Sequence, residues 1–110
     1  MIVFLFGLLV SILFFQKIAM LHPIFTDILR FRIALSLAKN SSDFNNLKTE
    51  FLATDGNLSF HLRKLESEWI IVVEKTFQWK KPHTRLSITD DGRKKLIEHL
   101  DELEKIIRNT

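Results

Sequence analysis

The feature that most constrains the fold of this chain is a change in the spacing of its apolar residues near residue 69. Between residue 22 and that point, apolar side chains recur at intervals of three or four residues, which is the period of an amphipathic helix. After it, the stretch "WIIVVEKTF" is rich in β-branched and aromatic residues, and "TRLSIT" alternates polar and apolar residues. Both patterns are typical of strands, so the chain must join a helical half to a small sheet.

Two helices are predicted at the start of the helical half. The first covers "HPIFTDILRFRIALSLAKN", with Pro23 in its first turn. The second is short, begins after an N-cap at Ser42 or Asp43, and carries an apolar stripe formed by Phe44, Leu47 and Phe51.

A tight turn leads to a third predicted helix, "TDGNLSFHLRKLE", over residues 54–66 and capped by Thr54 or Asp55. One face of this helix is apolar and consists of Leu58, His61, Leu62 and Leu65. The opposite face and its flanks carry Gly56, Asn57, Ser59, Phe60, Arg63 and Lys64. Asn and Arg can pair with base edges, Phe can contact a thymine methyl group, and Ser and Lys suit phosphates. An ordinary solvated face that happens to carry one Phe explains the same residues.

The second half of the chain is predicted to be a hairpin followed by a helix. The segment "QWKKPH" separates the two strands and is predicted to be the loop. Thr89 caps a last helix at about residues 90–108, with Asp90 and Asp91 in its first turn. Two short helices joined by a tight turn and followed by a two-stranded wing predict a winged helix-turn-helix. The fold class is thus mainly α with a small β-hairpin, in the order α-α-α-β-β-α.

The predicted wing is basic. Between residues 75 and 85 it has no acidic residue and contains Lys75, Lys80, Lys81, His83 and Arg85. Such residues at a hairpin tip can follow a phosphate backbone or enter a minor groove. A basic loop kept soluble by its charge is the alternative interpretation.

The last helix has an apolar seam with alternating steps of four and three residues, formed by Leu96, Leu100, Leu103 and Ile107. The seam closes the domain's own core or pairs with a second copy of the chain. We favour a homodimer, because Ile97 and Ile106 widen the apolar surface beyond one seam.

The first 19 residues, which begin "MIVFLFGLLVSILFF", form a hydrophobic segment that we expect to lie outside the domain of residues 20–110. Fifteen helical residues reach about 22 Å, short of a hydrocarbon core of about 30 Å. One alternative is a membrane anchor, extended by the residues that follow, with the domain on the cytoplasmic side. The other is that Met20 is the true start and the protein is cytoplasmic.

The composition excludes several function classes. The length of 110 residues suits one domain. The chain has no Cys, which rules out disulfides and thiolate chemistry, and its four His have no ligand spacing. Because there is also no phosphate loop, nucleophile elbow or HExxH motif, we expect no enzyme activity, no metal and no cofactor. The net charge of +3 fits a nucleic-acid partner without requiring one.

Four stretches in order resemble the small MarR/ArsR-type winged-helix transcriptional regulators: "ILRFRIALSLA", "DFNNLK", "LSFHLRKLE" and "KKPHTRLSITDDGR". The resemblance covers residues 21–107. It implies that a homodimer binds double-stranded DNA, in some members under control of a small-molecule effector. It also implies that the helix of residues 54–66 enters the major groove and that the wing of residues 75–85 touches the backbone or minor groove.

This chain departs from the family pattern at two positions. Members usually have Gly after the third helix and in the wing, where this sequence has Trp69 and Trp79. Trp is costly in a left-handed conformation, so either the backbone differs there or strain is tolerated. These substitutions and the acidic residues of the last helix keep a second hypothesis open, a winged-helix module for protein association, with or without a membrane tether.

Overall fold

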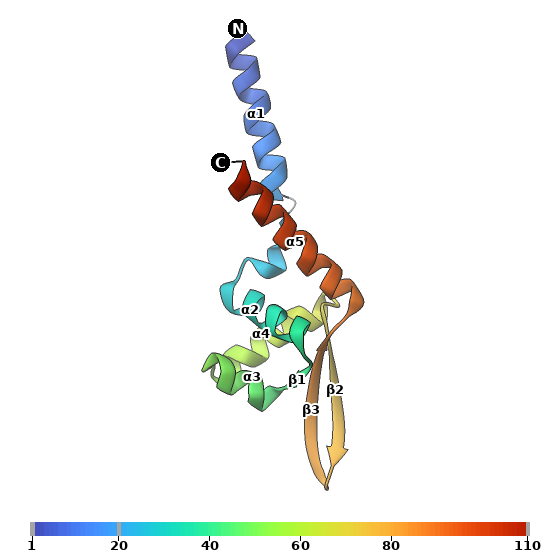
Figure 1. Cartoon of the computed structure of the whole chain (residues 1–110). Coiled ribbons are helices and arrows are strands. Elements are labelled where there is room, and N and C mark those ends of the chain that lie inside the picture. The colour runs from blue at the N-terminus through green and yellow to red at the C-terminus, as the bar shows by residue number, and fades with distance from the viewer. Residues whose placement is uncertain (1, 20, 110) are drawn as a thin grey trace.

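The computed structural model describes the backbone of residues 2–19 and 21–109, and the side chains of residues 3–12 and 21–109. Figure 1 shows a helical body, a long hairpin that leaves it at one end, and a separate helix that leaves it at the other. The elements are α1 (Ile2–Ala19), a 3-10 turn (Pro23–Phe25), α2 (Ile28–Lys39), β1 (Ser42–Asp43), α3 (Phe44–Phe51), α4 (Asp55–Ser67), β2 (Ile71–Gln78), β3 (Lys81–Ile88) and α5 (Asp90–Arg108).

The prediction that one helix starts at Pro23 was wrong. Pro23 opens a 3-10 turn, and α2 begins only at Ile28. The reason is a second helix start at Asp27, which has extended backbone and whose side chain accepts a hydrogen bond of 2.9 Å from the Arg30 N–H. The chain therefore bends between the two segments.

The helix-turn-helix is formed by α3 and α4, and local capping chemistry sets their starts. Of the two candidates at each start, Asp43 caps α3 and Thr54 caps α4. The Thr54 hydroxyl accepts a 3.1 Å hydrogen bond from the Asn57 N–H. The third helix is therefore confirmed to within a residue of its predicted range.

Both α3 and α4 end in the same way. At the end of α4, the N–H of Ile70 donates to the carbonyl of Leu65 and the N–H of Trp69 donates to the carbonyl of Glu66, each at 3.0 Å. This is a Schellman motif, in which the residue now occupied by Trp69 is usually Gly. Trp69 has a φ of 60°, and Leu52 has a φ of 50° at the corresponding position after α3. The departure from the family pattern therefore does not change the backbone, and the chain tolerates strain on the order of 1 kcal/mol at each position.

The sheet is larger than predicted and its loop is shorter. It has three strands in the order β1-β3-β2, because Ser42 and Asp43 pair with Leu86 and Arg85. The predicted loop "QWKKPH" is reduced to Trp79 and Lys80, so Pro82 lies inside β3 opposite Phe77. Pro82 is tolerated because β1 is too short to reach it, which leaves that part of β3 at an edge.

A buried core holds the body together. It contains Ile33 and Leu37 of α2, Leu47 of α3, Leu86 of β3, and the inner face of α4. The last helix is fixed to it at a close contact. Gly92 lies against the carbonyl oxygen of Ile70, where a β-carbon would collide. The Thr89 hydroxyl accepts a hydrogen bond of 2.8 Å from the Gly92 N–H and donates to the Trp69 carbonyl. Asp90 and Asp91 lie in the first turn of α5, as predicted.

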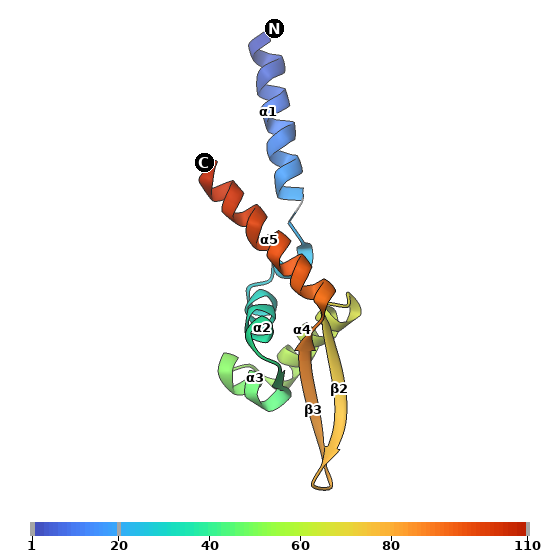
Figure 2. The ribbon, with the colours of Figure 1, turned by 45° about the vertical axis from the view of Figure 1, so that its right-hand side comes forward.

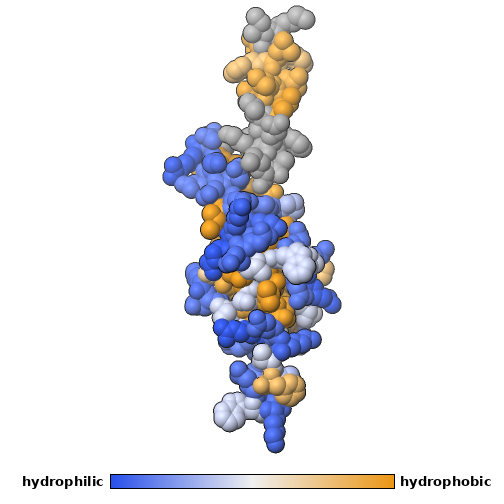
Figure 3. All heavy atoms as spheres, turned by 90° about the vertical axis from the view of Figure 1, so that its right-hand side faces the viewer, coloured by the Kyte–Doolittle hydropathy of each residue, from blue (hydrophilic) through white to orange (hydrophobic). Residues whose placement is uncertain are grey.

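The helix α1 extends away from the body, on the side opposite the hairpin (Figures 1 and 2). Its apolar side chains from Val3 to Ile12 are exposed, and Figure 3 shows them as a hydrophobic surface at one end of the molecule. Within the part of the chain that the structure describes, no helix combines the length and apolar character that crossing a membrane requires. Met20, the alternative start of the chain, lies outside the described residues.

Candidate nucleic-acid interface

One face of α4 is anchored and the other is open. Leu58, Leu62 and Leu65 are buried, and so is His61, as the helical period predicted. The remaining predicted contact residues are exposed or half-buried: Gly56, Asn57, Ser59, Phe60, Arg63 and Lys64. The structure thus brings together on one surface all the outward residues that the sequence singled out on this helix.

His61 helps to hold α4 against α2. Its Nδ1 lies 3.4 Å from a guanidinium nitrogen of Arg30, and its Nε2 lies 3.7 Å from the Asp27 carboxylate. Because Arg can only donate, Nδ1 accepts and Nε2 carries the proton that faces Asp27. The hydrogen bond from the Arg30 N–H lowers the pKa of Asp27, and the positive charge of the Arg30 side chain lowers it as well. Sequence reasoning missed Asp27 and Arg30, because α2 and α4 meet only in the folded chain.

The start of α4 is open to approach. A β-carbon on Gly56 would have no neighbour within 4 Å, so a large group can come close to the backbone there. Thr54 is already used as the cap. Asp55 would repel an anion, but Lys48 of α3 lies 2.7 Å from its carboxylate. Lys48 was not among the predicted site residues.

Phe60 is 46% exposed and has two polar neighbours. The Lys64 ammonium lies 5.7 Å from the centre of its ring, and the His61 ring meets it edge-on. Phe60 therefore offers a flat apolar surface next to a positive charge on the exposed face of α4.

The basic residues of the wing are exposed but do not form one cluster. Side chains alternate between the two faces of a strand, so the paired register separates them. Lys81, His83 and Arg85 lie on one face of the hairpin, and Lys75 lies on the other with Phe77. Lys80 is in the loop.

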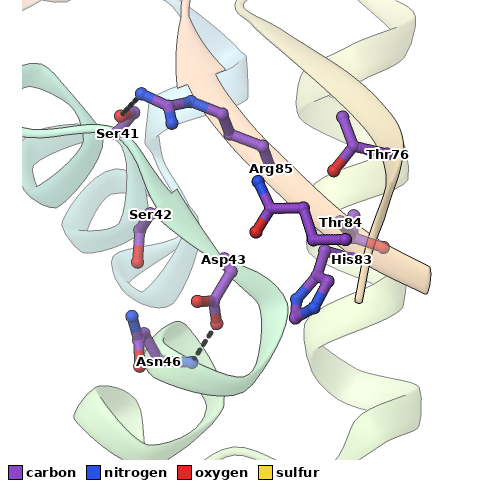
Figure 4. Close-up of a pocket in the computed structure, with 9 residues that line it drawn as sticks. Ser41, Ser42, Asp43, Asn46, Thr76, His83, Thr84 and Arg85 are labelled. Atoms are coloured by element: carbon purple, nitrogen blue, oxygen red, sulfur yellow. Dashed lines mark hydrogen bonds between the residues drawn. The ribbon is translucent and has the colours of Figure 1, made fainter. Parts of the chain in front are cut away.

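A groove of about 360 Å³ lies between the start of α3 and the hairpin, on the hairpin face that carries His83 and Arg85 (Figure 4). A guanidinium nitrogen of Arg85 donates to the Ser41 hydroxyl at 2.8 Å, which ties the wing to the segment between α2 and β1. His83 and Arg85 were predicted site residues; the groove also has polar lining that was not predicted, from Ser41, Ser42, Asp43, Asn46, Thr76, Gln78 and Thr84. No sequence signal could place these residues together, because they meet through the pairing of β1 with β3.

His22 and His99, which the sequence did not single out, join the segment before α2 to α5. The backbone N–H of His22 donates to Nδ1 of His99 at 3.1 Å, and the His22 ring lies 3.1 Å from the Glu98 carboxylate. His99 is 3% exposed and packs against Phe25 and Phe31. Burial lowers the pKa of His99, and the nearby His22 lowers it further.

The predicted seam of α5 is divided by the fold. Leu96 is 2% exposed and belongs to the domain's own core, so its assignment to a dimer contact needs correction. Leu103 is half-buried. Leu100 and Ile107 are exposed, together with Ile97. Leu96 therefore does not contribute to the exposed apolar surface of α5, which is narrower near the start of the helix than the heptad spacing predicted.

Comparison with known proteins places this geometry in context. The sequence model of the winged helix DNA-binding domain family matches residues 29–107. An uncharacterized protein of Methanocaldococcus jannaschii is 32% identical over 87 residues, which are 78% of this chain and 95% of that protein.

Two solved structures extend the comparison. A transcriptional regulator homologue from Pyrococcus horikoshii superposes with a TM-score of 0.72 and 26% identity over 78% of this chain and 86% of its own. PadR of Bacillus subtilis, solved in complex with operator DNA, superposes with a TM-score of 0.59 and 23% identity over 66% of this chain and 46% of its own. The predicted fold, a winged helix of the transcriptional-regulator type, is confirmed.

Proposed function

The chain belongs to the family of winged helix DNA-binding domains, and we propose that it is a transcriptional regulator that binds double-stranded DNA as a homodimer. The observation that carries the proposal is the open face of α4. Its inner residues are buried, while its polar, basic and aromatic residues point away from the body. The α4 helix enters the major groove with this face.

The residues of this face have distinct roles in the proposal. Arg63 and Asn57 contact base edges, since Arg pairs with guanine and Asn with adenine. Phe60 contacts a thymine methyl group. Ser59 and Lys64 bind phosphates nearby. Gly56 and Thr54 let the backbone at the helix start approach a phosphate.

The wing supplies contacts outside the major groove. Lys75, Lys80, Lys81 and His83 bind the backbone or the edge of the minor groove. Arg85 acts at the base of the wing, where its bond to Ser41 leaves the rest of its guanidinium for a phosphate. PadR, which shares the fold, was solved in complex with operator DNA, and this likeness of fold supports the proposal.

The homodimer forms through α5. Leu100, Leu103 and Ile107 contact the second copy, while Leu96 stays in the core. A two-fold axis there places two α4 helices about one DNA turn, or about 34 Å, apart.

A salt titration tests the proposal. The probe is a mixed-sequence duplex of about 30 base pairs, long enough for two half-sites. Each phosphate contact releases counterions, so affinity should fall steeply as salt rises. Lys80→Ala with Lys81→Ala should flatten the log-log slope by about two units. The matched control, Lys94→Ala with Arg108→Ala, removes the same charge from α5 and should keep the slope.

The second candidate function is protein association, and the exposed aromatic residues favour it. The two functions predict different responses of DNA binding to salt and to the substitution Arg63→Ala. Binding to DNA that is insensitive to both salt and Arg63→Ala would sink the regulator proposal and leave the association module.

A further inference from the structure

The loop at the tip of the wing has an unusual residue for its backbone. Trp79 and Lys80 are the two residues between the strands, and their φ angles are 55° and 63°. Two positive φ angles are the mark of a tight hairpin turn that favours Asn-Gly or Gly-Gly. A bulky side chain adds a steric cost there. The chain keeps a Trp where a small residue has the lower energy, and retained strain of this kind points to a function.

The tip also exposes more apolar surface than the fold needs. Trp79 is 94% exposed and Phe77 is 77% exposed. Phe77 is on the same sheet face as Lys75 and Val73, because side chains alternate along β2. Figure 3 shows a hydrophobic group among hydrophilic atoms at the end of the hairpin. Neither ring belongs to the core of the described chain.

The charges around these rings select the kind of partner. From Lys75 to Thr89 every charged side chain is cationic: Lys75, Lys80, Lys81 and Arg85. Aromatic rings within a purely cationic segment match a polyanion that also offers apolar surfaces. DNA meets both conditions, because its phosphates are anionic and its stacked bases have apolar faces.

The shape of the molecule argues against a lipid partner at this tip. The helix α1 and the hairpin tip lie at opposite ends (Figures 1 and 2). A bilayer that received the apolar side chains of α1 would be remote from Trp79. In contrast, a strand of eight residues reaches about 26 Å, more than the half turn of about 17 Å that separates α4 in a major groove from the next minor groove.

We propose that Trp79, supported by Phe77, enters the minor groove as an apolar wedge between base pairs and kinks the DNA. This rests on the proposed function and adds to it a DNA-bending step and a sequence preference at the wing. Partial unstacking by an apolar side chain bends DNA toward the major groove, and pyrimidine–purine steps yield most easily. The wing therefore favours such a step beside each α4 site.

The first test compares two Trp→Gly variants. Trp79→Gly removes the wedge and relieves a left-handed position, so the protein still folds. Trp69→Gly is the matched control, because Trp69 is also exposed and left-handed but lies at the other end of β2. Trp79→Gly should weaken binding to a duplex of about 30 base pairs by about 10-fold. It should also abolish the bend, measured by energy transfer between end-labelled strands, and keep the salt slope. Trp69→Gly should change none of these.

The second test observes the ring directly. The chain has two Trp residues, so Trp69→Phe leaves Trp79 as the only one. Duplex DNA should quench its fluorescence and shield it from acrylamide. Vesicles containing phosphatidylserine, added instead of DNA, should do neither.

The outcomes separate the wedge from the function on which it rests. Salt-dependent DNA binding with an acrylamide-accessible Trp79, or an unchanged bend in Trp79→Gly, overturns the wedge and leaves the regulator. Shielding of Trp79 by vesicles and not by DNA overturns the wedge in favour of a lipid surface. If the unmodified protein shows no salt-dependent DNA binding, both proposals are overturned.

Discussion

Single residues in this protein hold its elements at fixed contacts, and the two glycines in the first turns of α4 and α5 differ sharply in this respect. Gly92 touches the carbonyl of Ile70, whereas Gly56 has open space around it. The contact at Gly92 fixes the start of α5 to the start of β2, together with the Thr89 cap. Gly56 has no such packing role, so its small size matters only for what approaches α4 from outside.

Substitution of these two glycines should have opposite effects on stability. Gly92→Ala should lower the free energy of unfolding by about 2–3 kcal/mol, because backbone atoms must move to admit a β-carbon. Gly56→Ala should raise it by about 0.5 kcal/mol, since Ala is the better helix former. Urea unfolding followed by circular dichroism measures both. Equal stability of the two variants would show that the Gly92 contact is not tight in solution.

At the scale of the element, the sequence predicted most helices and strands because their signals are local. Apolar spacing predicted α4, the β-branched and aromatic residues predicted β2, and side-chain caps predicted the starts of α3, α4 and α5. The start of α2 was missed although its cap at Asp27 is local, whereas the errors in the sheet have tertiary causes. The strand β1 exists only because β3 lies beside it, and Pro82 fits a strand only because β1 is too short to reach it. The contact between His22 and His99 joins residues 77 positions apart, so no local pattern announces it.

The burial of His99, reinforced by the nearby His22, predicts a dependence of stability on pH. In the folded chain the pKa of His99 lies below 6.5, its ordinary value in an unfolded chain. As pH falls through 6.5 the unfolded state takes up a proton that the folded state does not, so stability should decrease on acidification below that value. The low pKa of Asp27 acts only near and below pH 3.8, so the two effects are separable.

His99→Asn tests this assignment, because the Asn side-chain oxygen can replace Nδ1 as the acceptor for the His22 N–H. The variant should lose the decrease in unfolding free energy between pH 7 and 5 that the unmodified protein shows. His83→Gln is the control, as His83 is exposed on the wing. An identical pH profile in His99→Asn would assign the dependence to another group.

At the scale of the whole molecule, the elements lie along one long axis, with extents of 73 × 26 × 22 Å. The apolar helix α1 is at one end, the aromatic and basic wing tip is at the other, and the open face of α4 belongs to the body between them (Figure 2). The sequence predicted which residues of α4 point outward, because helical period alone decides that. It could not predict the separation of the wing cations onto two faces, because the register of the hairpin decides that.

The central claim is that α4 recognises DNA sequence in a two-fold dimer. The most direct measurement is selection of bound duplexes from a randomised pool, followed by sequencing. We predict an inverted repeat with half-sites about 10 base pairs apart. Arg63→Ala should lose the preference for one base pair in each half-site, and Leu100→Glu should select single half-sites. A pool that shows no enriched sequence at low salt, or the same enriched sequence with Arg63→Ala, would contradict the claim.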